Sequence, residues 1–233
     1  GAILLGVSGG ADSLALAIAT QLEAKDREVI PVVIDHGLQE GSAAIATETV
    51  QKLAKIGFTK IETLRIKVEV TDGIEASARR ARFEAFDSLA KCYESTIFFL
   101  GHTENDLAES VLLGLARGSG TRSLSGMAHH NGIYIRPLLE ITRVQSEEFC
   151  IEIGLKFWSD PHNQDSQFAR VRVRTEALPT LEKTIGPGIS DALARSAHLL
   201  RDDADALDHW AQREAIHLDL ADLDCAHLET LPR

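Results

Sequence analysis

The chain has 233 residues, of which 44% are apolar and 25% are charged, a composition typical of a globular protein and unlike that of a disordered one. No apolar run approaches the roughly 18 residues that a membrane-spanning helix needs, so we expect a cytoplasmic protein without a membrane partner. The net charge of -11 argues against non-specific coating of nucleic acid, which needs a dense positive surface.

The first half of the chain alternates short apolar runs with longer stretches of helical spacing. Strands buried on both faces of a parallel sheet are predicted over residues 2–7, 29–34, 61–66 and 97–100. Helices are predicted over residues 14–22, 43–56, 74–89 and 107–115. Four successive strand–helix units favour an α/β fold with a doubly wound, mostly parallel, Rossmann-like sheet, whose ligands bind at the carboxyl ends of the strands.

The second half is less regular. It predicts a Gly, Ser and Thr-rich loop over 117–125, a short strand over 133–135, a helix over 142–153 and then an Arg-rich helix. Gly186-Pro187-Gly188 is the strongest helix breaker in the chain, and acidic helical sequence follows it. We therefore expect a main domain over residues 1–185, and over residues 186–233 a helical linker with the start of a small helical C-terminal domain.

The first predicted strand leads into Ser8-Gly9-Gly10-Ala11-Asp12-Ser13 and directly on into a helix. Paired glycines allow a tight turn and a close approach of the backbone, and the first helical amides with the two hydroxyls suit an anion. The loop lacks the lysine of a Walker P-loop and the third glycine of a dinucleotide fingerprint. It predicts a phosphate cradle; the alternative is a glycine turn in which Asp12 or Ser13 caps the helix.

Polar residues follow the end of the second predicted strand. Asp35 stands where a catalytic or metal-binding carboxylate is usual, although a loop aspartate that caps the next turn is an equal alternative. His36 suits a substrate contact or a hydrogen bond within the loop.

Glu75, Arg79 and Arg82 are spaced to share one face of the third predicted helix. Guanidinium groups concentrated there suit phosphates, whereas a surface Glu–Arg pair is the ordinary alternative. His102, Asp106 and Glu109 repeat the spacing at the start of the fourth helix. Two carboxylates and an imidazole could bind Mg²⁺, hold an ammonium group or accept its proton, or could form a solvated helix face.

The pattern Ser8 to Ser13 after a first strand resembles the PP-loop of the ATP pyrophosphatases, which split ATP into AMP and pyrophosphate. Over about residues 2–180 the chain resembles the catalytic domain of tRNA(Ile)-lysidine synthetase. Besides the loop, the matching stretches are 34–38, 75–82, 101–109, 117–120, 136–139 and 158–163, followed by Arg170, Arg172 and Arg174. The family usually carries two adjacent aspartates where this chain has Asn105 and Asp106, and we take Asp106 as the functional one.

The resemblance implies a ligase that modifies the wobble cytidine of tRNA(Ile) with a CAU anticodon. ATP would lie on Ser8, Gly9, Gly10, Asp12 and Ser13, with Mg²⁺ held by Asp35. The C2 oxygen of the cytidine would attack the α-phosphorus, and the amine of L-lysine would then displace AMP to give lysidine. The expected catalytic residues are Asp35, Arg82, His102, Asp106 and Glu109, and the expected substrate-binding residues are His36, Arg79, Arg117, Asn163 and Arg170.

Three arginines at i, i+2 and i+4, namely Arg170, Arg172 and Arg174, cannot all point one way on a helix, so at least one is expected to be structural. To reconcile the acidic charge with a tRNA substrate, we expect the positive groups to cluster in space. Those groups are Arg79 to Arg82, Arg117, Arg122 and Arg170 to Arg174.

Two other functions remain possible on the sequence evidence. The chain is also expected to be a possible homodimer. The first is another PP-loop enzyme, such as a tRNA thiolase or an amidating NAD or GMP synthetase; sulfur transfer is disfavoured because the three cysteines form no CxxC pair. The second is a non-catalytic module that only binds ATP.

Overall fold

The computed structural model describes residues 1–35, 37, 41–69, 71, 73–159, 165–216 and 229–230, without the side chains of Ile74 and Glu75. The predictions for His36 and Asn163 fall outside the described residues. The centre is a six-stranded sheet in the order β3-β2-β1-β4-β6-β5. Its strands are β1 (Ile3–Val7), β2 (Val29–Asp35), β3 (Glu62–Arg65), β4 (Ile97–Leu100), β5 (His130–Asn131) and β6 (Tyr134–Ile135). Only the β5–β6 pair is antiparallel among these, so the predicted doubly wound, mostly parallel sheet is confirmed.

Helices follow the first four strands as predicted. They are α1 (Ala11–Glu23), α2 (Ser42–Ile56), α3 (Ile74–Cys92) and α4 (Glu104–Ala116). The later helical elements are α5 (Thr121–Leu124), α6 (Arg143–Glu152), α7 (Ala169–Arg172), the π-helical turn η2 (Val173–Ala177), α8 (Leu178–Thr184) and α9 (Ile189–Ala215). The loop predicted over 117–125 was wrong in part, because α5 forms inside it. Packing overrides the weak local propensity there: Leu124 lies against Gly114, and Arg122 pairs with carboxylates of α9.

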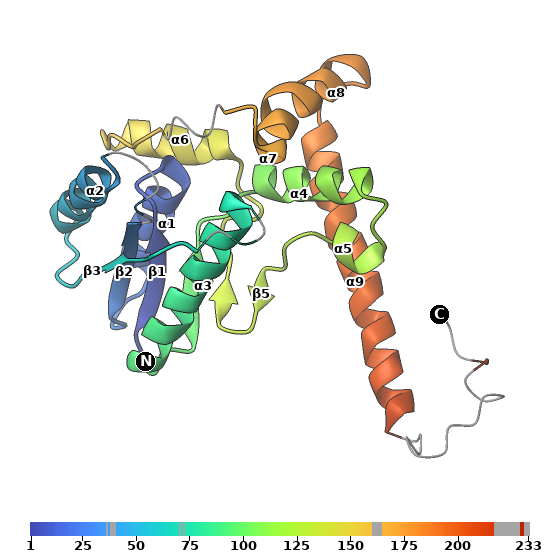
Figure 1. Ribbon diagram of the computed structural model, residues 1–233, viewed down its shortest axis with the longest axis horizontal. Helices are drawn as coiled ribbons and strands as arrows, with labels where there is room; N and C mark the ends of the chain where they lie inside the picture. The colour runs from blue at the N-terminus through green and yellow to red at the C-terminus, as the bar shows by residue number, and fades with distance from the viewer. Residues whose placement is uncertain are drawn as a thin grey trace.

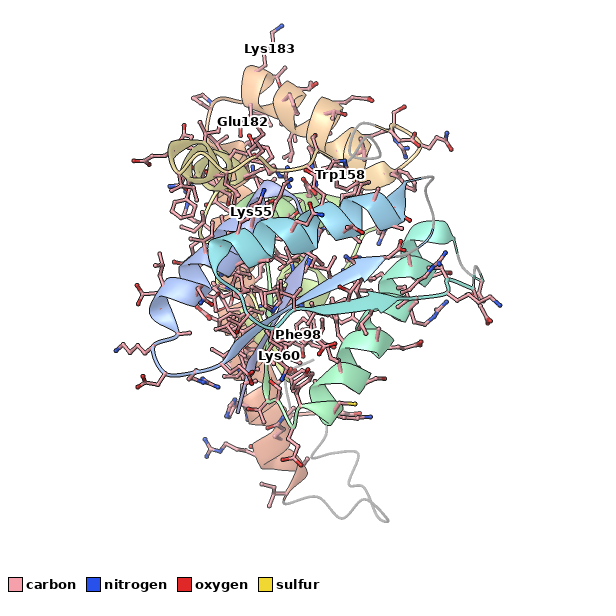
Figure 2. The ribbon with its side chains drawn as sticks, turned by 90° about the vertical axis from the view of Figure 1, so that its left-hand side faces the viewer. Lys55, Lys60, Phe98, Trp158, Glu182 and Lys183 are labelled. Atoms are coloured by element: carbon pink, nitrogen blue, oxygen red, sulfur yellow. The ribbon has the colours of Figure 1, made fainter. Side chains whose placement is uncertain are left out.

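Alternating residues of β1 are buried in two different cores. Leu5 and Val7 belong to the core that includes residues of α1, α2 and α6, whereas Leu4 belongs to the core that includes residues of α3. Side chains of a strand alternate between the two faces of a sheet, so a strand covered on both faces is apolar throughout. Figure 2 labels Phe98, a fully buried residue of β4 in the second core.

A third core joins the sheet domain to α9. It contains Leu107 and Val111 of α4, Leu139, and Ala194 and Ala197 of α9. Figure 1 shows α9 crossing α4 and then running on away from the sheet. The small alanines let the two helices approach closely. In the described part of the chain no helix has both the length and the apolarity that crossing a membrane requires.

Candidate active site

The loop between β1 and α1 is braced by its own hydroxyl groups. Ser13 Oγ accepts a hydrogen bond from the Ser8 amide at 3.2 Å and donates one to the Gly10 carbonyl at 3.0 Å. Gly9 has φ of +87°, a left-handed conformation that strains residues with a side chain. A Cβ added to Gly9 would lie only 2.5 Å from Thr49 Oγ1. The loop therefore has one closely defined shape, with the start of α1 directly behind it.

The end of β4 comes very close to this loop. A Cβ on Gly101 would lie 3.1 Å from Ser13 Cα and 3.2 Å from the Ser13 amide nitrogen. Glycine at position 101 thus allows the fourth strand exit to pack directly on the first turn of α1. The exits of β1 and β4 therefore converge, and this brings the start of α4 beside the loop of Ser8 to Ser13.

A cavity of about 560 Å³ opens at this edge of the sheet. It brings together nine of the predicted residues, namely Ser8, Gly10, Asp12, Ser13, Arg79, Arg82, His102, Asp106 and Arg170. The chain after α6 closes one side, because the Trp158 amide donates to the Gly9 carbonyl at 2.9 Å. Figure 2 labels Trp158 above the strand ends, on the side away from Phe98. The cavity therefore has the loop of Ser8 to Ser13, the arginines of α3 and the first turn of α4 as neighbouring walls.

Asp12 is an unusual carboxylate. Burial raises its pKa to about 6, although the Arg143 guanidinium, with Nε 3.6 Å from Asp12 Oδ2, opposes the shift. Its Oδ1 is buried and accepts no hydrogen bond from the residues that the structure describes. A buried acceptor without a donor is costly to a folded protein and is typical of a group whose partner is a ligand.

Neutralising Asp12 is expected to stabilise the fold at neutral pH. The pKa is raised from 3.8 when unfolded to about 6 when folded, so the folded state pays a penalty that is complete above pH 6 and absent below pH 3.8. Asp12→Asn should therefore raise the unfolding free energy by about 3 kcal/mol at pH 7.5 and by about half as much at pH 5. Urea unfolding at both pH values measures this, and an equal gain at the two would contradict a titrating Asp12.

His102 lines the cavity in a partly buried position. Burial lowers its pKa to about 4, and the positive charges of Arg136 and Arg79 act in the same direction against the opposing carboxylate of Asp106. The imidazole is therefore neutral at physiological pH. Its Nδ1 is buried and has no hydrogen-bond partner among the described residues, so the ring can still serve a ligand with this nitrogen.

Asp106 has a structural task besides its place in the cavity. Its Oδ2 accepts hydrogen bonds from the Thr103 amide at 3.0 Å and from Thr103 Oγ1 at 3.2 Å, which is a capping box for α4. Burial would raise its pKa, but Arg143 and the Thr103 amide outweigh burial and hold the pKa below the usual range. Asp106 is thus an ionised carboxylate in a fixed orientation. The spacing Thr103-x-x-Asp106 is the sequence signal of this cap.

Glu109 is completely buried and surrounded by guanidinium groups. Arg170 Nε donates to Glu109 Oε2 at 3.0 Å, and Arg174 Nε donates to Oε1 at 2.6 Å. Arg172 turns away and donates to the carbonyls of Ser166 and Gln167, which confirms that one of the three arginines is structural. Glu109 is not part of the cavity wall itself; it fixes the arginines that are.

Several other predicted residues lie at or beyond the edge of this site. Asp35 is buried at the end of β2, where Oδ1 accepts from the Gly37 amide at 3.0 Å and Oδ2 lies 3.9 Å from Arg65 Nε. Arg117 is exposed just past the C-terminal end of α4, about 10 Å along the helix from Ser110, which lines the cavity. Arg122 pairs with Asp205 at 2.5 Å and also with Asp208.

The expected clustering of positive charge was wrong in part. Arg79, Arg82, Arg170 and Arg174 line one cavity, whereas Arg117 and Arg122 are not part of its wall. Arg122, Arg170 and Arg174 are each paired with a carboxylate, because α5, α7 and η2 pack against acidic residues of α9 and α4.

Sequence reasoning missed two charged residues of α6 that line the cavity, Arg143 and Glu147. Their spacing carries no motif that would have singled them out. Arg143 approaches carboxylates of both α1 and α4, with Nη2 donating to Asp106 Oδ1 at 3.2 Å.

Comparison with known proteins places this site in a family. The family model of the PP-loop domain matches residues 1–181. The tRNA(Ile)-lysidine synthase of Thermobifida fusca (strain YX) is 48% identical, over 99% of this chain and 72% of the relative. The chain belongs to the tRNA(Ile)-lysidine synthase family.

Other similarities agree with membership of the lysidine synthase family. The tRNA(Ile)-lysidine synthase of Streptomyces coelicolor (strain ATCC BAA-471 / A3(2) / M145) is 48% identical, over 99% of this chain and 67% of the relative. Among solved structures, the U34-tRNA thiolase NcsA from Methanococcus maripaludis with its [4Fe-4S] cluster aligns with a TM-score of 0.67 over 85% of this chain and 72% of that one. Its sequence is 19% identical, so this likeness concerns the PP-loop fold alone.

Proposed function

We propose that this chain, as a tRNA(Ile)-lysidine synthase, joins L-lysine to C2 of the wobble cytidine of tRNA(Ile) in the cytoplasm, with ATP as the second substrate. One observation carries the proposal: the loop of Ser8 to Ser13, the imidazole of His102 just before α4 and the carboxylate of Asp106 in α4 share a single cavity. A cytidine activated at this loop would therefore have beside it the Asp106 carboxylate, which can bind the lysine ammonium group.

The cradle suits the leaving diphosphate of ATP. Amides at the start of α1 carry the positive end of the helix dipole, and the bracing by Ser13 orients the loop before a ligand arrives. Arg79 and Arg82 on the wall formed by α3 offer guanidinium forks to phosphate oxygens. Adenylylation at this place makes the C2 oxygen a leaving group, since AMP departs far more readily than an unactivated carbonyl oxygen.

Asp35 is the residue that we propose to hold Mg²⁺. Magnesium in nucleotide enzymes commonly binds one or two carboxylates together with substrate phosphates, so a single buried carboxylate at a strand end fits it. When bound, the ion would neutralise phosphate charge.

The second step needs a neutral lysine amine. The ionised Asp106 would hold the ammonium group in place until its proton passes to solvent. The lowered pKa of His102 makes it a weak base, so we propose that its free Nδ1 serves the substrate as a hydrogen-bonding group and not as the proton acceptor. Arg170 contacts both the cavity and Glu109, so we assign Glu109 the positioning of Arg170. Arg117, His36 and Asn163 stay proposed as tRNA contacts.

The decisive assay incubates the chain with ATP, L-lysine and unmodified tRNA(Ile), followed by mass analysis of the nucleosides. Lysidine together with lysine-dependent release of AMP is the expected result. Tight ATP binding without turnover would instead favour a nucleotide-binding module, and AMP release that needs a sulfur donor would favour a thiolase.

Asp106→Asn is expected to separate the two half-reactions. The asparagine oxygen can still accept from the Thr103 amide, so α4 keeps its cap, while the charge that would hold an ammonium is lost. We expect single-turnover transfer of lysine to fall about 100-fold. Adenylate formation, measured as pyrophosphate release without lysine, should fall less than about tenfold, because Arg143 keeps its ion pair with Glu109 and the hydrogen bond from its amide to Asn105. Equal loss in both steps would contradict a role in lysine binding.

A further inference from the structure

The carboxylates of Asp12, Asp106 and Glu109 converge beside one cation on α6. Arg143 Nε lies 3.6 Å from Asp12 Oδ2, Nη2 lies 3.2 Å from Asp106 Oδ1, and Nη1 lies 3.6 Å from Glu109 Oε1. Asp12 belongs to the nucleotide loop and the other two to α4. One guanidinium therefore links two elements that meet through non-local packing.

The other arginines of the site do not duplicate this link. Arg170 and Arg174 reach Glu109, and Arg174 Nη2 also lies 3.6 Å from Asp106 Oδ1. Among the described residues, Arg143 is the one cation found within 4.0 Å of the Asp12 carboxylate. Without Arg143, Asp12 and Asp106 would repel each other across the gap between α1 and α4.

The backbone of Arg143 is held in place by Asn105. Asn105 Oδ1 accepts a hydrogen bond from the Arg143 amide at 2.8 Å, and the neighbouring Glu104 amide donates to the Ile141 carbonyl at 3.0 Å. The residue before Arg143, Thr142, forms a capping box with Gln145. The start of α6 is thus attached to the start of α4, which gives Asn105 a role that its sequence position alone does not reveal.

The far end of α6 is fixed on α1. Cys150 is completely buried in the core that also contains Ala11 and Leu14. Figure 1 shows α6 lying over α1. Helix α6 is attached to α1 through its core face and to α4 through Asn105. The Arg143 guanidinium therefore cannot move with α1 alone or with α4 alone.

We propose that Arg143, held by Asn105, is a positioning residue that keeps the nucleotide loop and the acidic face of α4 in register for both half-reactions. The inference rests on the proposed function. A group that fixes the relative position of two half-sites acts on the rate of each step rather than on the affinity for ATP, because misplacement of about 1 Å costs on the order of 100-fold in rate.

The test compares Arg143→Gln, Asn105→Ala and Asn105→Asp with a distant arginine variant, Arg27→Gln. Arg27 is exposed, and its guanidinium donates to the Gly1 carbonyl. We expect Arg143→Gln to lose about 100-fold in kcat of both adenylate formation and lysine transfer, with the KM for ATP changed less than about threefold. Asn105→Ala should lose about tenfold in both steps, as for one hydrogen bond, while Asn105→Asp and Arg27→Gln stay near wild type.

Four results would overturn the inference. They are a raised KM for ATP at unchanged kcat, loss of lysine transfer alone, a lower melting temperature with normal kinetics, and equal damage from Asn105→Asp and Asn105→Ala.

A readout without turnover separates this inference from the proposed function. In a double-mutant cycle of urea unfolding, Arg143→Gln and Asp12→Asn should be non-additive because the two side chains are paired. Additive effects would refute the link even if the protein makes lysidine. Non-additivity in a protein that makes none would refute the function and leave the structural link standing.

Discussion

Replacing Ser13 by alanine is expected to lower the rate of pyrophosphate release at least about 100-fold. The Ser13 hydroxyl accepts from the Ser8 amide and donates to the Gly10 carbonyl, so it braces the loop from inside. Its loss frees the amides that must be oriented toward a developing negative charge before reaction, and removal of one such oriented group commonly costs 100- to 1,000-fold. The rate is measured with tRNA and ATP in the absence of lysine.

The fold should survive this change. Ser13 is a small residue on the first turn of α1, and the apolar residues behind it, Leu14 and Leu16, stay in place. Circular dichroism melting checks this point. Ser88→Ala on the exposed surface of α3, where the hydroxyl donates only to the Glu84 carbonyl, is the matched control and should behave as wild type. A wild-type rate for Ser13→Ala would remove the loop from the nucleotide site.

Gly9→Ala is expected to damage both activity and stability. The new Cβ would meet Thr49 Oγ1 at 2.5 Å, and this hydroxyl is held by its own hydrogen bond to the Ile45 carbonyl at 2.9 Å. The φ of +87° adds backbone strain. We expect a loss of about 2 kcal/mol or more in the free energy of unfolding and about 100-fold in pyrophosphate release.

A second substitution separates the clash from the strain. Thr49→Ala removes the oxygen that the new Cβ would meet, so the double variant should recover part of the stability while the unfavourable φ remains. Gly120→Ala is the control, since Gly120 has φ of -76° and nothing lies within 4 Å of an added Cβ. Full recovery in the double variant would mean that backbone strain at Gly9 is negligible, and no loss in Gly9→Ala would mean that the loop is not closely defined.

The features of the candidate site that could be predicted from the sequence are those built by local interactions. The loop of Ser8 to Ser13 and the approach of His102 and Asp106 to one cavity were predictable, because they depend on strand ends and on spacing within a few residues. Glu109 was predicted on the same face but lies outside the cavity wall, where it pairs with Arg170 and Arg174. The cap that Asp106 forms with Thr103 was equally local and was overlooked.

The fate of the arginines was not predictable in the same way. Arg122 was expected to serve tRNA, but it pairs with Asp205 on α9, more than 80 residues later in the chain. A guanidinium pairs with the carboxylate that helix packing brings close to it. The distance between two groups on different helices cannot be predicted from a single sequence. The same holds for Arg143, which lies 37 residues from Asp106 in sequence and beside it in space.

Sequence alone determined the first four strand–helix units and the glycine-containing loop between β1 and α1, because hydrophobic periodicity and glycine conformation act over short stretches of chain. Only the tertiary structure decided which charges are neutralised, which face the cavity and which hold others in place. Those outcomes depend on how α4, α6 and α9 pack on one another, and side-chain electrostatics changes steeply over the few ångströms that packing sets.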